Sequence, residues 1–268
     1  MKVLITGHKG FIGKAFQLDT ENDFEQVLYD IADSDMSLKE VLLSTRPDAV
    51  FHFGACSDTM NTNLDTFMKD NVQSTFFLAD WCSLHQVPLI YSSSASVYGH
   101  GNGSPFSLYS MSKYVTDRYV VKSGGISLRY FNVYGYDESH KGKMASFAFQ
   151  SIIKFRNAEQ VSIFPIQPTR DFIYIKDVIE ANLHALRNYK KLKGNFYDVG
   201  TGKSRTFEEM LDFLNIPYDY LPSHMIPKHY QFYTKADLGK KMGGWKANWS
   251  LELGLEDYIN TLNINYFI

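Results

Sequence analysis

Short runs of apolar and β-branched residues alternate with amphipathic stretches over the first two-thirds of the chain. The runs predict β-strands at residues 3–6, 24–29, 49–53, 89–92 and 127–131. The clearest helix is 64–82, where an apolar stripe is formed by Leu64, Met68, Val72 and Phe76, with Phe67 and Ala79 on the same side. Because strands that alternate with helices are typical of βαβ units, we expect an α/β fold with a doubly wound parallel sheet.

The chain after about Gly142 is less regular, with a break at 164–168 and a C-terminal part rich in Tyr, His and Pro. We interpret it as a smaller C-terminal substrate domain, interleaved with the first domain. The first would span 1–142 with parts of 171–200, and the second 143–170 and 200–268.

Composition narrows the class of protein. Of the 268 residues, 44% are apolar and 21% charged, an ordinary globular balance that excludes disorder, collagen and coiled coil. A net charge of −2 gives no reason to expect nucleic acid or a membrane as partner, and no metal site is expected. With only Cys56 and Cys82, and no apolar stretch typical of a signal peptide or membrane span, we expect a cytoplasmic protein.

A glycine-rich turn follows the first predicted strand and opens a helix at Phe11. Its GxxGxxG spacing comprises Gly7, Gly10 and Gly13. Glycine lets the backbone turn tightly and approach a pyrophosphate, which then lies at the positive end of the helix. The turn therefore predicts a dinucleotide site.

Two residues bear on which dinucleotide binds. Asp30 lies 23 residues after Gly7, where a carboxylate can accept from the adenosine ribose and favour NAD, although the acids Asp33 and Asp35 are close by. Lys9, in the glycine turn, could neutralise the extra phosphate of NADP. The sequence leaves NAD and NADP open.

Tyr109 and Lys113 form a YxxxK pair, which on a helix lies on one face. A neighbouring ammonium group favours the phenolate, so the pair suits proton exchange with a sugar hydroxyl. Upstream, Ser92, Ser93 and Ser94 end a predicted strand, where open parallel sheets bind ligands.

These motifs, in this order, resemble the extended short-chain dehydrogenase/reductase superfamily of nucleotide-sugar epimerases and dehydratases. The resemblance covers nearly the whole chain and extends to the segments 51–55, 129–135, 170–174 and 198–202. It implies a Rossmann-type sheet, NAD or NADP as cofactor and a nucleotide-sugar substrate. It also implies a homodimer formed through helix 64–82 and the helix of Tyr109, with Phe77, Trp81 and Tyr119 as candidates for the apolar contact.

The resemblance also implies residue roles. Tyr109 would be the general base, Lys113 would hold the nicotinamide ribose, and Ser94, with Ser93 as its alternative, would hold the substrate hydroxyl. The cofactor-binding residues would be Gly7, Lys9, Gly10, Phe11, Ile12, Gly13, Asp30, Phe53, Gly54, Ala55, Asn71, Tyr109 and Lys113. The substrate-binding residues would be Ser93, Ser94, Asn132, Lys141, Lys143, Phe164, Arg170 and Tyr230.

Three segments, 54–57, 140–146 and 230–238, resemble the ADP-L-glycero-D-manno-heptose 6-epimerases in particular. That likeness implies inversion at C6 through a transient ketone, with Lys141 as a second acid/base. The alternative for Lys141 is a phosphate clamp or a solvated charge. Arg170 would bind the diphosphate, the alternative being an ion pair with Asp171, and Tyr230 could equally be a core aromatic.

Four departures affect the substrate more than the reaction. The connections after Asp30 and Gly99 are short, and Lys143 and Gln150 stand where that subfamily tends to have serine and histidine. The alternatives are therefore another nucleotide-sugar 4-epimerase or epimerase/reductase acting on a GDP- or UDP-sugar, and a non-catalytic NAD(P)-binding regulator. The intact Ser94, Tyr109 and Lys113 argue against the regulator.

Overall fold

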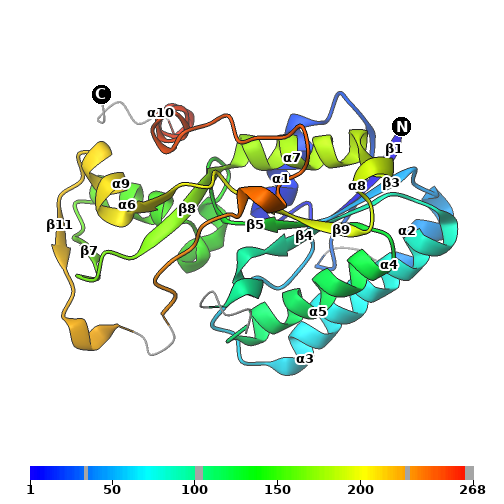
Figure 1. Ribbon diagram of the computed structural model, residues 1–268, viewed down its shortest axis with the longest axis horizontal. Coiled ribbons are helices and arrows are strands. Elements are labelled where there is room, and N and C mark those ends of the chain that lie inside the picture. Colours follow the sequence, from blue (N-terminus) through cyan, green and yellow to red (C-terminus); the bar gives the residue numbers. More distant parts are fainter. Residues whose placement is uncertain (33–35, 100–104, 227–229, 263–268) are drawn as a thin grey trace.

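A six-stranded parallel sheet forms the centre of the computed structural model, which describes residues 1–32, 36–99, 105–226 and 230–262 (Figure 1). Its order is β2-β1-β3-β4-β5-β9. The strands are β1 (Lys2–Thr6), β2 (Glu25–Tyr29), β3 (Ala49–His52), β4 (Leu89–Ser94), β5 (Ile126–Tyr130) and β9 (Asn195–Val199). The prediction of a parallel α/β sheet is confirmed. From β1 the chain adds β2 on one side and β3 and the later strands on the other, so the strand order switches between β1 and β3.

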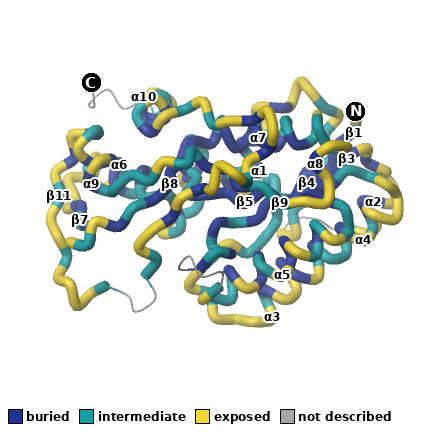
Figure 2. Tube along the Cα trace, viewed as in Figure 1, coloured by how far each residue is buried: buried dark blue, intermediate teal, exposed yellow. Residues whose placement is uncertain are grey.

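Alternating side chains of the strands are buried on opposite faces of the sheet. Val3 and Ile5 join a cluster with α1 (Phe11–Asp19) and α7 (Ile175–Arg187), whereas Leu4 joins a second cluster. The helices of the second cluster are α2 (Leu38–Thr45), α4 (Ser74–His85) and α5 (Leu108–Lys122). Because both faces are covered, the strands read as nearly continuous apolar runs, and Figure 2 shows them buried.

The remaining chain builds a smaller part at one end of the sheet (Figure 1). It holds two small sheets, of order β10-β8-β6 and β11-β7. Their strands are β6 (Asn132–Tyr134), β7 (Val161–Ile163), β8 (Thr169–Tyr174), β10 (Ser204–Thr206) and β11 (Tyr218–Tyr220). The helices are α6 (Phe147–Arg156), α9 (Phe207–Phe213) and α10 (Leu251–Thr261). The chain enters this part at β6, returns for α7, α8 (Tyr189–Leu192) and β9, and leaves again, so one hydrophobic cluster runs through both parts.

The long helix differs from its predicted form. It begins as α3 (Leu64–Thr66), continues as a π-helical segment η1 (Phe67–Gln73) and becomes α4. Phe67, Val72 and Ala79 are buried, whereas Leu64 and Met68 of the predicted apolar stripe are 55% and 41% exposed. A π turn holds more residues than an α turn and therefore rotates the preceding side chains away from the core.

Both short connections are described only in part. Among its described residues, the connection after Asp30 contains one short helix, α2, as its length suggested. Asp33, Asp35 and positions 100–104 of the link after Gly99 lie outside the described residues. In the part of the chain that is described, no helix has the length and apolar character needed to cross a membrane.

Candidate functional site

The glycine turn lies between β1 and α1 and folds closely on its surroundings. Gly7 has a φ of 69°, and a Cβ atom there would lie 2.4 Å from the Gly54 nitrogen. A Cβ atom at Gly13 would lie 2.2 Å from the Gly7 carbonyl oxygen. Gly10 is the N-cap of α1 and brings no side chain to this helix end. Only glycine fits at Gly7 and Gly13, so no side chain of these two residues stands between the backbone of the turn and a bound ligand.

Two cavities meet at this turn. One, of about 560 Å³, extends from Gly7 past Tyr29 and Asp30, at the end of β2, to Lys39 and Lys69. The other, of about 440 Å³, extends from the same turn to the ends of β4 and β5. Both are lined by Gly7, Gly10, Phe53 and Ala55. Together they form a groove across the carboxyl ends of the strands, where open parallel sheets bind ligands, and its two halves meeting at a glycine turn fit a dinucleotide.

Helix α5 brings Tyr109 and Lys113 into the second cavity. The helix is capped by Ser107, whose hydroxyl accepts from the Ser110 N–H, so Tyr109 lies in the first turn. Lys113 is 4% exposed and donates to the Ser92 carbonyl oxygen over 2.7 Å. The pair therefore reaches back from the helix onto the end of β4.

β4 supplies Ser92, Ser93 and Ser94 to the same cavity, and it runs two residues further than predicted, so that it includes the last two. Ser94 hydrogen-bonds Tyr109, and its hydroxyl oxygen also accepts from the Ser96 N–H. The buried Ser93 hydroxyl has no hydrogen-bond partner among the described residues. Both predicted serines are in place, and only Ser93 has an unused buried hydroxyl.

Burial has the largest effect on the pKa values of Tyr109 and Lys113. Burial raises the pKa of Tyr109, and the hydrogen bond from Ser94 opposes this only in part. Burial lowers the pKa of Lys113 to about 7, with the charge of Asp117 opposing the shift. In the free protein Tyr109 is therefore a phenol, and a positive charge brought into the cavity by a ligand would favour its deprotonation.

Lys141 reaches the same cavity from the segment η3 (Ser139–Met144). Its ammonium nitrogen lies 5.2 Å from the centre of the Phe11 ring, at the start of α1. Burial lowers its pKa, while the nearby charge of Glu138 raises it. Lys143, two residues on, is exposed and lies outside the described lining of the cavity. The structure thus brings one of the two lysines of this run to Tyr109.

The small part of the molecule holds the other candidates. Arg170 is 7% exposed and donates to the carbonyl oxygens of Thr169 and Gln231. Its guanidinium carbon lies 5.3 Å from the ring centre of Tyr230, which meets Phe164 edge-on at 5.1 Å. The alternative of an ion pair with Asp171 does not fit, since that carboxylate accepts from the N–H groups of Thr201, Gly202 and Ala236. Asn132 lines the second cavity, and its amide oxygen accepts from the Thr234 hydroxyl.

Two of the predicted cofactor residues stand apart from the groove. Asn71 is fully buried in η1, outside the described lining of both cavities. Its amide oxygen accepts from the Cys56 N–H, and its amide nitrogen donates to the Cys56 carbonyl oxygen and the Ser112 hydroxyl. It ties the loop after β3 to α5. Lys9 is exposed and likewise outside the described lining.

Several lining residues were not predicted. Cys56, Ser57 and Thr59 follow the predicted Gly54 and Ala55 and line the cavities. They could have been predicted, because they come soon after the carboxyl end of β3, and ligands bind at that end of parallel strands. Lys39 and Phe207 come from segments far away in sequence. Nothing in their local sequence pattern indicates a site.

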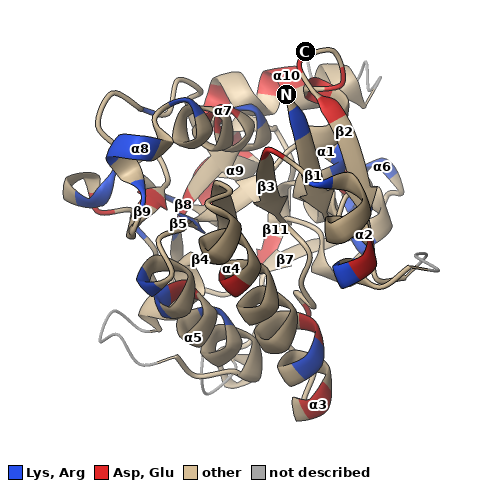
Figure 3. Ribbon diagram, turned by 90° about the vertical axis from the view of Figure 1, so that its right-hand side faces the viewer, with Lys and Arg blue, Asp and Glu red and all other residues tan. Residues whose placement is uncertain are grey.

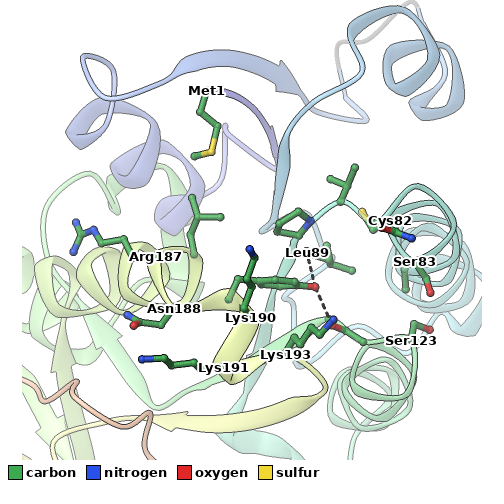
Figure 4. A pocket seen from close by; sticks show the side chains of 18 of the residues that line it. Met1, Cys82, Ser83, Leu89, Ser123, Arg187, Asn188, Lys190, Lys191 and Lys193 are labelled. Atoms are coloured by element: carbon green, nitrogen blue, oxygen red, sulfur yellow. Dashed lines mark hydrogen bonds between the residues drawn. The ribbon is translucent and has the colours of Figure 1, made fainter.

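A third and larger cavity, of about 1160 Å³, lies at the opposite, amino ends of the strands (Figure 4). Its lining includes Met1 before β1, Leu89 at the start of β4, and the lysines Lys190, Lys191 and Lys193. Figure 3 shows the positive charge of the lysines on α8 in blue. Helices α4, α5 and α7 all end here, and cations compensate the negative carbonyl ends of helices. A cluster of lysines at this place is thus favourable without a ligand.

The fold and the groove define a Rossmann-type protein with a groove that fits a dinucleotide and with Ser94, Tyr109 and Lys113 in one cavity. The model of the NAD dependent epimerase/dehydratase family matches residues 3–200, and the chain belongs to this family. Membership implies a nicotinamide dinucleotide as cofactor.

Individual relatives agree with this assignment. An ADP-L-glycero-D-manno-heptose-6-epimerase of Brachyspira hyodysenteriae is 36% identical, over 82% of this chain and 77% of its own length. The crystal structure of the enzyme of that name from Helicobacter pylori is 26% identical and has a TM-score of 0.81, covering 98% of this chain and 96% of its own. A UDP-glucuronic acid 4-epimerase from Bacillus cereus, solved with UDP-glucuronic acid and NAD, is 22% identical and shares the fold with a TM-score of 0.79, covering 98% of this chain and all of its own.

Proposed function

We propose that this enzyme inverts C6 of an ADP-glycero-manno-heptose, through transient oxidation to a ketone and reduction on the opposite face. The observation that carries the proposal is the meeting of Lys141 with Ser94, Tyr109 and Lys113 in one cavity of about 440 Å³. The names of the Brachyspira and Helicobacter relatives support the choice of sugar. A second proton donor suits an epimerase, since the two faces of a ketone need donors at different places.

The cofactor's nicotinamide, when bound, accepts the hydride from C6 and returns it. The glycine turn would hold the pyrophosphate, Lys113 the nicotinamide ribose, and Asp30 the adenosine ribose. We propose NAD rather than NADP, because Asp30 lines the adenosine half of the groove while Lys9 is outside its described lining.

The protons are handled by the chain's own side chains. In one half-reaction Tyr109 removes the proton from the C6 hydroxyl, with Ser94 holding the hydroxyl oxygen through a hydrogen bond. C6 belongs to a side arm outside the sugar ring, so the ketone can rotate about one bond. After rotation Lys141, whose pKa burial lowers, donates a proton to the same oxygen. Tyr109 then releases its proton to water and Lys141 regains one from water. The hydride and the protons thus balance, and substrate and product exchange without net consumption of cofactor.

The remainder of the substrate would extend into the smaller part of the molecule. The buried Arg170 guanidinium lies over the Tyr230 ring there, and Phe164 meets that ring edge-on. We assign the diphosphate to the Arg170 guanidinium and the adenine to the aromatic rings. Asn132, in the cavity, would contact the sugar. On this basis the six-stranded sheet and its helices act as the cofactor domain, and the interleaved part acts as the substrate domain.

We further propose a homodimer that forms through α5 and the α3–η1 segment. Leu64, Met68, Met111 and Val115 on these elements are 41–55% exposed, and α5 packs beside η1. Phe77, Trp81 and Tyr119, the residues expected at the contact, are partly buried against the core cluster of their own chain. Both cysteines are free thiols, which supports the reducing cytoplasm as the compartment.

The deciding experiment is an NMR time course of the purified protein with ADP-D-glycero-D-manno-heptose and trace NAD. We expect the C6-inverted sugar to accumulate to equilibrium, with no net absorbance change at the wavelength of reduced cofactor. No conversion by protein that binds NAD would refute the proposed sugar. UDP- and GDP-sugars, assayed in parallel for 4-epimerisation, would then test the other substrates of the family.

A further inference from the structure

Glu138 occupies an unusual position behind the segment that carries Lys141. It is only 1% exposed, although it precedes the exposed residues Ser139 and His140. A carboxylate is rarely buried to this extent unless several hydrogen bonds satisfy its oxygens.

The carboxylate joins the two ends of the Lys141 segment. On the amino side it accepts from the Gly135 N–H over 3.3 Å. On the carboxyl side it accepts from both the N–H and the hydroxyl of Ser146, the N-cap of α6, over 2.5 and 2.6 Å. One side chain thereby closes the segment between β6 and α6 into a fixed loop.

A fourth hydrogen bond extends this anchor to a distant part of the chain. The Tyr258 hydroxyl, on α10, donates to the Glu138 carboxylate over 3.0 Å. On the other side Asp137 forms an ion pair of 2.8 Å with Lys14 of α1, the helix that opens at the glycine turn. The Lys141 segment is therefore held against both α1 and α10.

We propose that Glu138 is a positioning residue, which fixes the segment bearing Lys141 and places a negative charge behind its ammonium group. The proposal rests on the proposed function, in which Lys141 exchanges a proton with the substrate. Precise placement matters there, because a shift of about 1 Å in a catalytic group can cost roughly a hundredfold in rate.

The negative charge of Glu138 affects the pKa of Lys141 in a known direction. It raises the pKa of Lys141 and so opposes the lowering by burial. The titratable groups of the segment itself include Asp137, His140 and Lys143. Lys14 of α1 pairs with Asp137, Tyr258 of α10 hydrogen-bonds Glu138, and Tyr109 and Lys113 share the cavity with Lys141. Loss of the Glu138 charge should therefore move the titration of Lys141 to lower pH.

Two variants test this role. Glu138→Gln removes the charge, and Tyr258→Phe removes one hydrogen bond while leaving the charge. We expect kcat to fall by about a hundredfold in the first and about three- to tenfold in the second, with the KM for substrate changing less. Tyr197→Phe is the matched control, since it removes one tyrosine hydrogen bond, to the Leu192 carbonyl oxygen, away from the site.

The decisive readout does not depend on activity. Labelling of Lys141 by limiting acetic anhydride, followed by mass spectrometry across pH, reports its titration in folded protein. We expect the midpoint to move to lower pH in Glu138→Gln and to stay in Tyr197→Phe. An unchanged midpoint and kcat in folded Glu138→Gln would overturn the role of Glu138. Full activity of Lys141→Met would instead refute the proposed catalytic role of Lys141. If Glu138→Gln fails to fold, Tyr258→Phe decides, and an unchanged kcat would overturn the positioning role.

Discussion

The Lys113 ammonium group donates to the Ser92 carbonyl oxygen over 2.7 Å and thereby fastens α5 to the end of β4. The side chain is buried, and its pKa is lowered to about 7. The bond keeps Tyr109, one turn earlier on α5, beside Ser94. The charge of Asp117 offsets the effect of burial on Lys113 only in part, so this lysine should affect stability as well as catalysis.

Lys113→Met should change how stability depends on pH. In the unfolded chain the lysine titrates near its usual value of about 10.4, so between pH 7 and 10 the unfolded state binds more protons. The contribution of Lys113 to the free energy of unfolding therefore rises with pH through this window. Between pH 6 and 9.5, we expect wild type to gain about 2–4 kcal/mol relative to Lys113→Met. Urea denaturation of cofactor-free protein at both pH values measures this, and parallel pH profiles would contradict the depressed pKa.

Tyr109→Phe and Lys141→Met should each impair catalysis without abolishing binding. Because each donor serves one orientation of the ketone, each single variant should lose about 10²–10⁴-fold in kcat, and the double variant should be inactive. The NMR time course measures the rates, and quenching of intrinsic fluorescence checks NAD binding. Lys154→Met, at an exposed position on α6, is the control for loss of a lysine. Full activity of Lys141→Met would remove this lysine from the mechanism.

Asp30→Asn should reduce the preference for NAD over NADP. The carboxylate can accept from the adenosine ribose and repels a phosphate at the same place. A charged hydrogen bond contributes about 1.5–3 kcal/mol, so we expect NAD affinity to fall roughly tenfold or more. NADP affinity should rise. Titration calorimetry with both cofactors tests this, with Asp212→Asn on the exposed side of α9 as control. An unchanged ratio of the two affinities would show that Asp30 does not select the cofactor.

The buried ion pair of Arg129 with Asp117 should be important for stability. The two side chains are 6% and 1% exposed and meet at 2.6 Å. Asp117→Asn leaves the arginine charge uncompensated and should cost about 3–5 kcal/mol in urea denaturation. Glu180→Gln breaks the exposed pair with Arg187 and should cost less than about 1 kcal/mol. Equal losses of unfolding free energy in the two variants would show that the buried ion pair contributes no more to stability than the exposed one.

Met111→Lys should separate the proposed dimer. Met111 is 52% exposed on α5, one turn before the exposed Val115. A charge placed in an apolar contact loses its hydration without gaining a partner, so association should weaken. Sedimentation equilibrium of wild type and variant measures this, with Lys154→Met as control. A dimer of unchanged affinity would show that copies meet at another surface.

Much of the fold follows from local pattern. The strands were predictable because β-branched runs buried on both faces are distinctive, and the glycine turn because its backbone excludes other residues. The YxxxK pair needed only helical spacing, and the serines needed only the end of a strand. Each of these signals lies within a few residues of sequence.

Other features depend on contacts between distant segments. The π-helical segment turned Leu64 and Met68 outward, and no periodicity in the sequence marks such a turn. Asn71 ties a loop to a helix, and Glu138 joins β6, α6 and α10 through one carboxylate. A buried polar group takes its partners from wherever the fold brings them. The sequence by itself therefore determined the sheet, the dinucleotide turn and the Ser/Tyr/Lys set. Only tertiary structure decided that Lys141, and not Lys143, enters the cavity beside Tyr109, because the placement of that segment depends on contacts up to 120 residues apart.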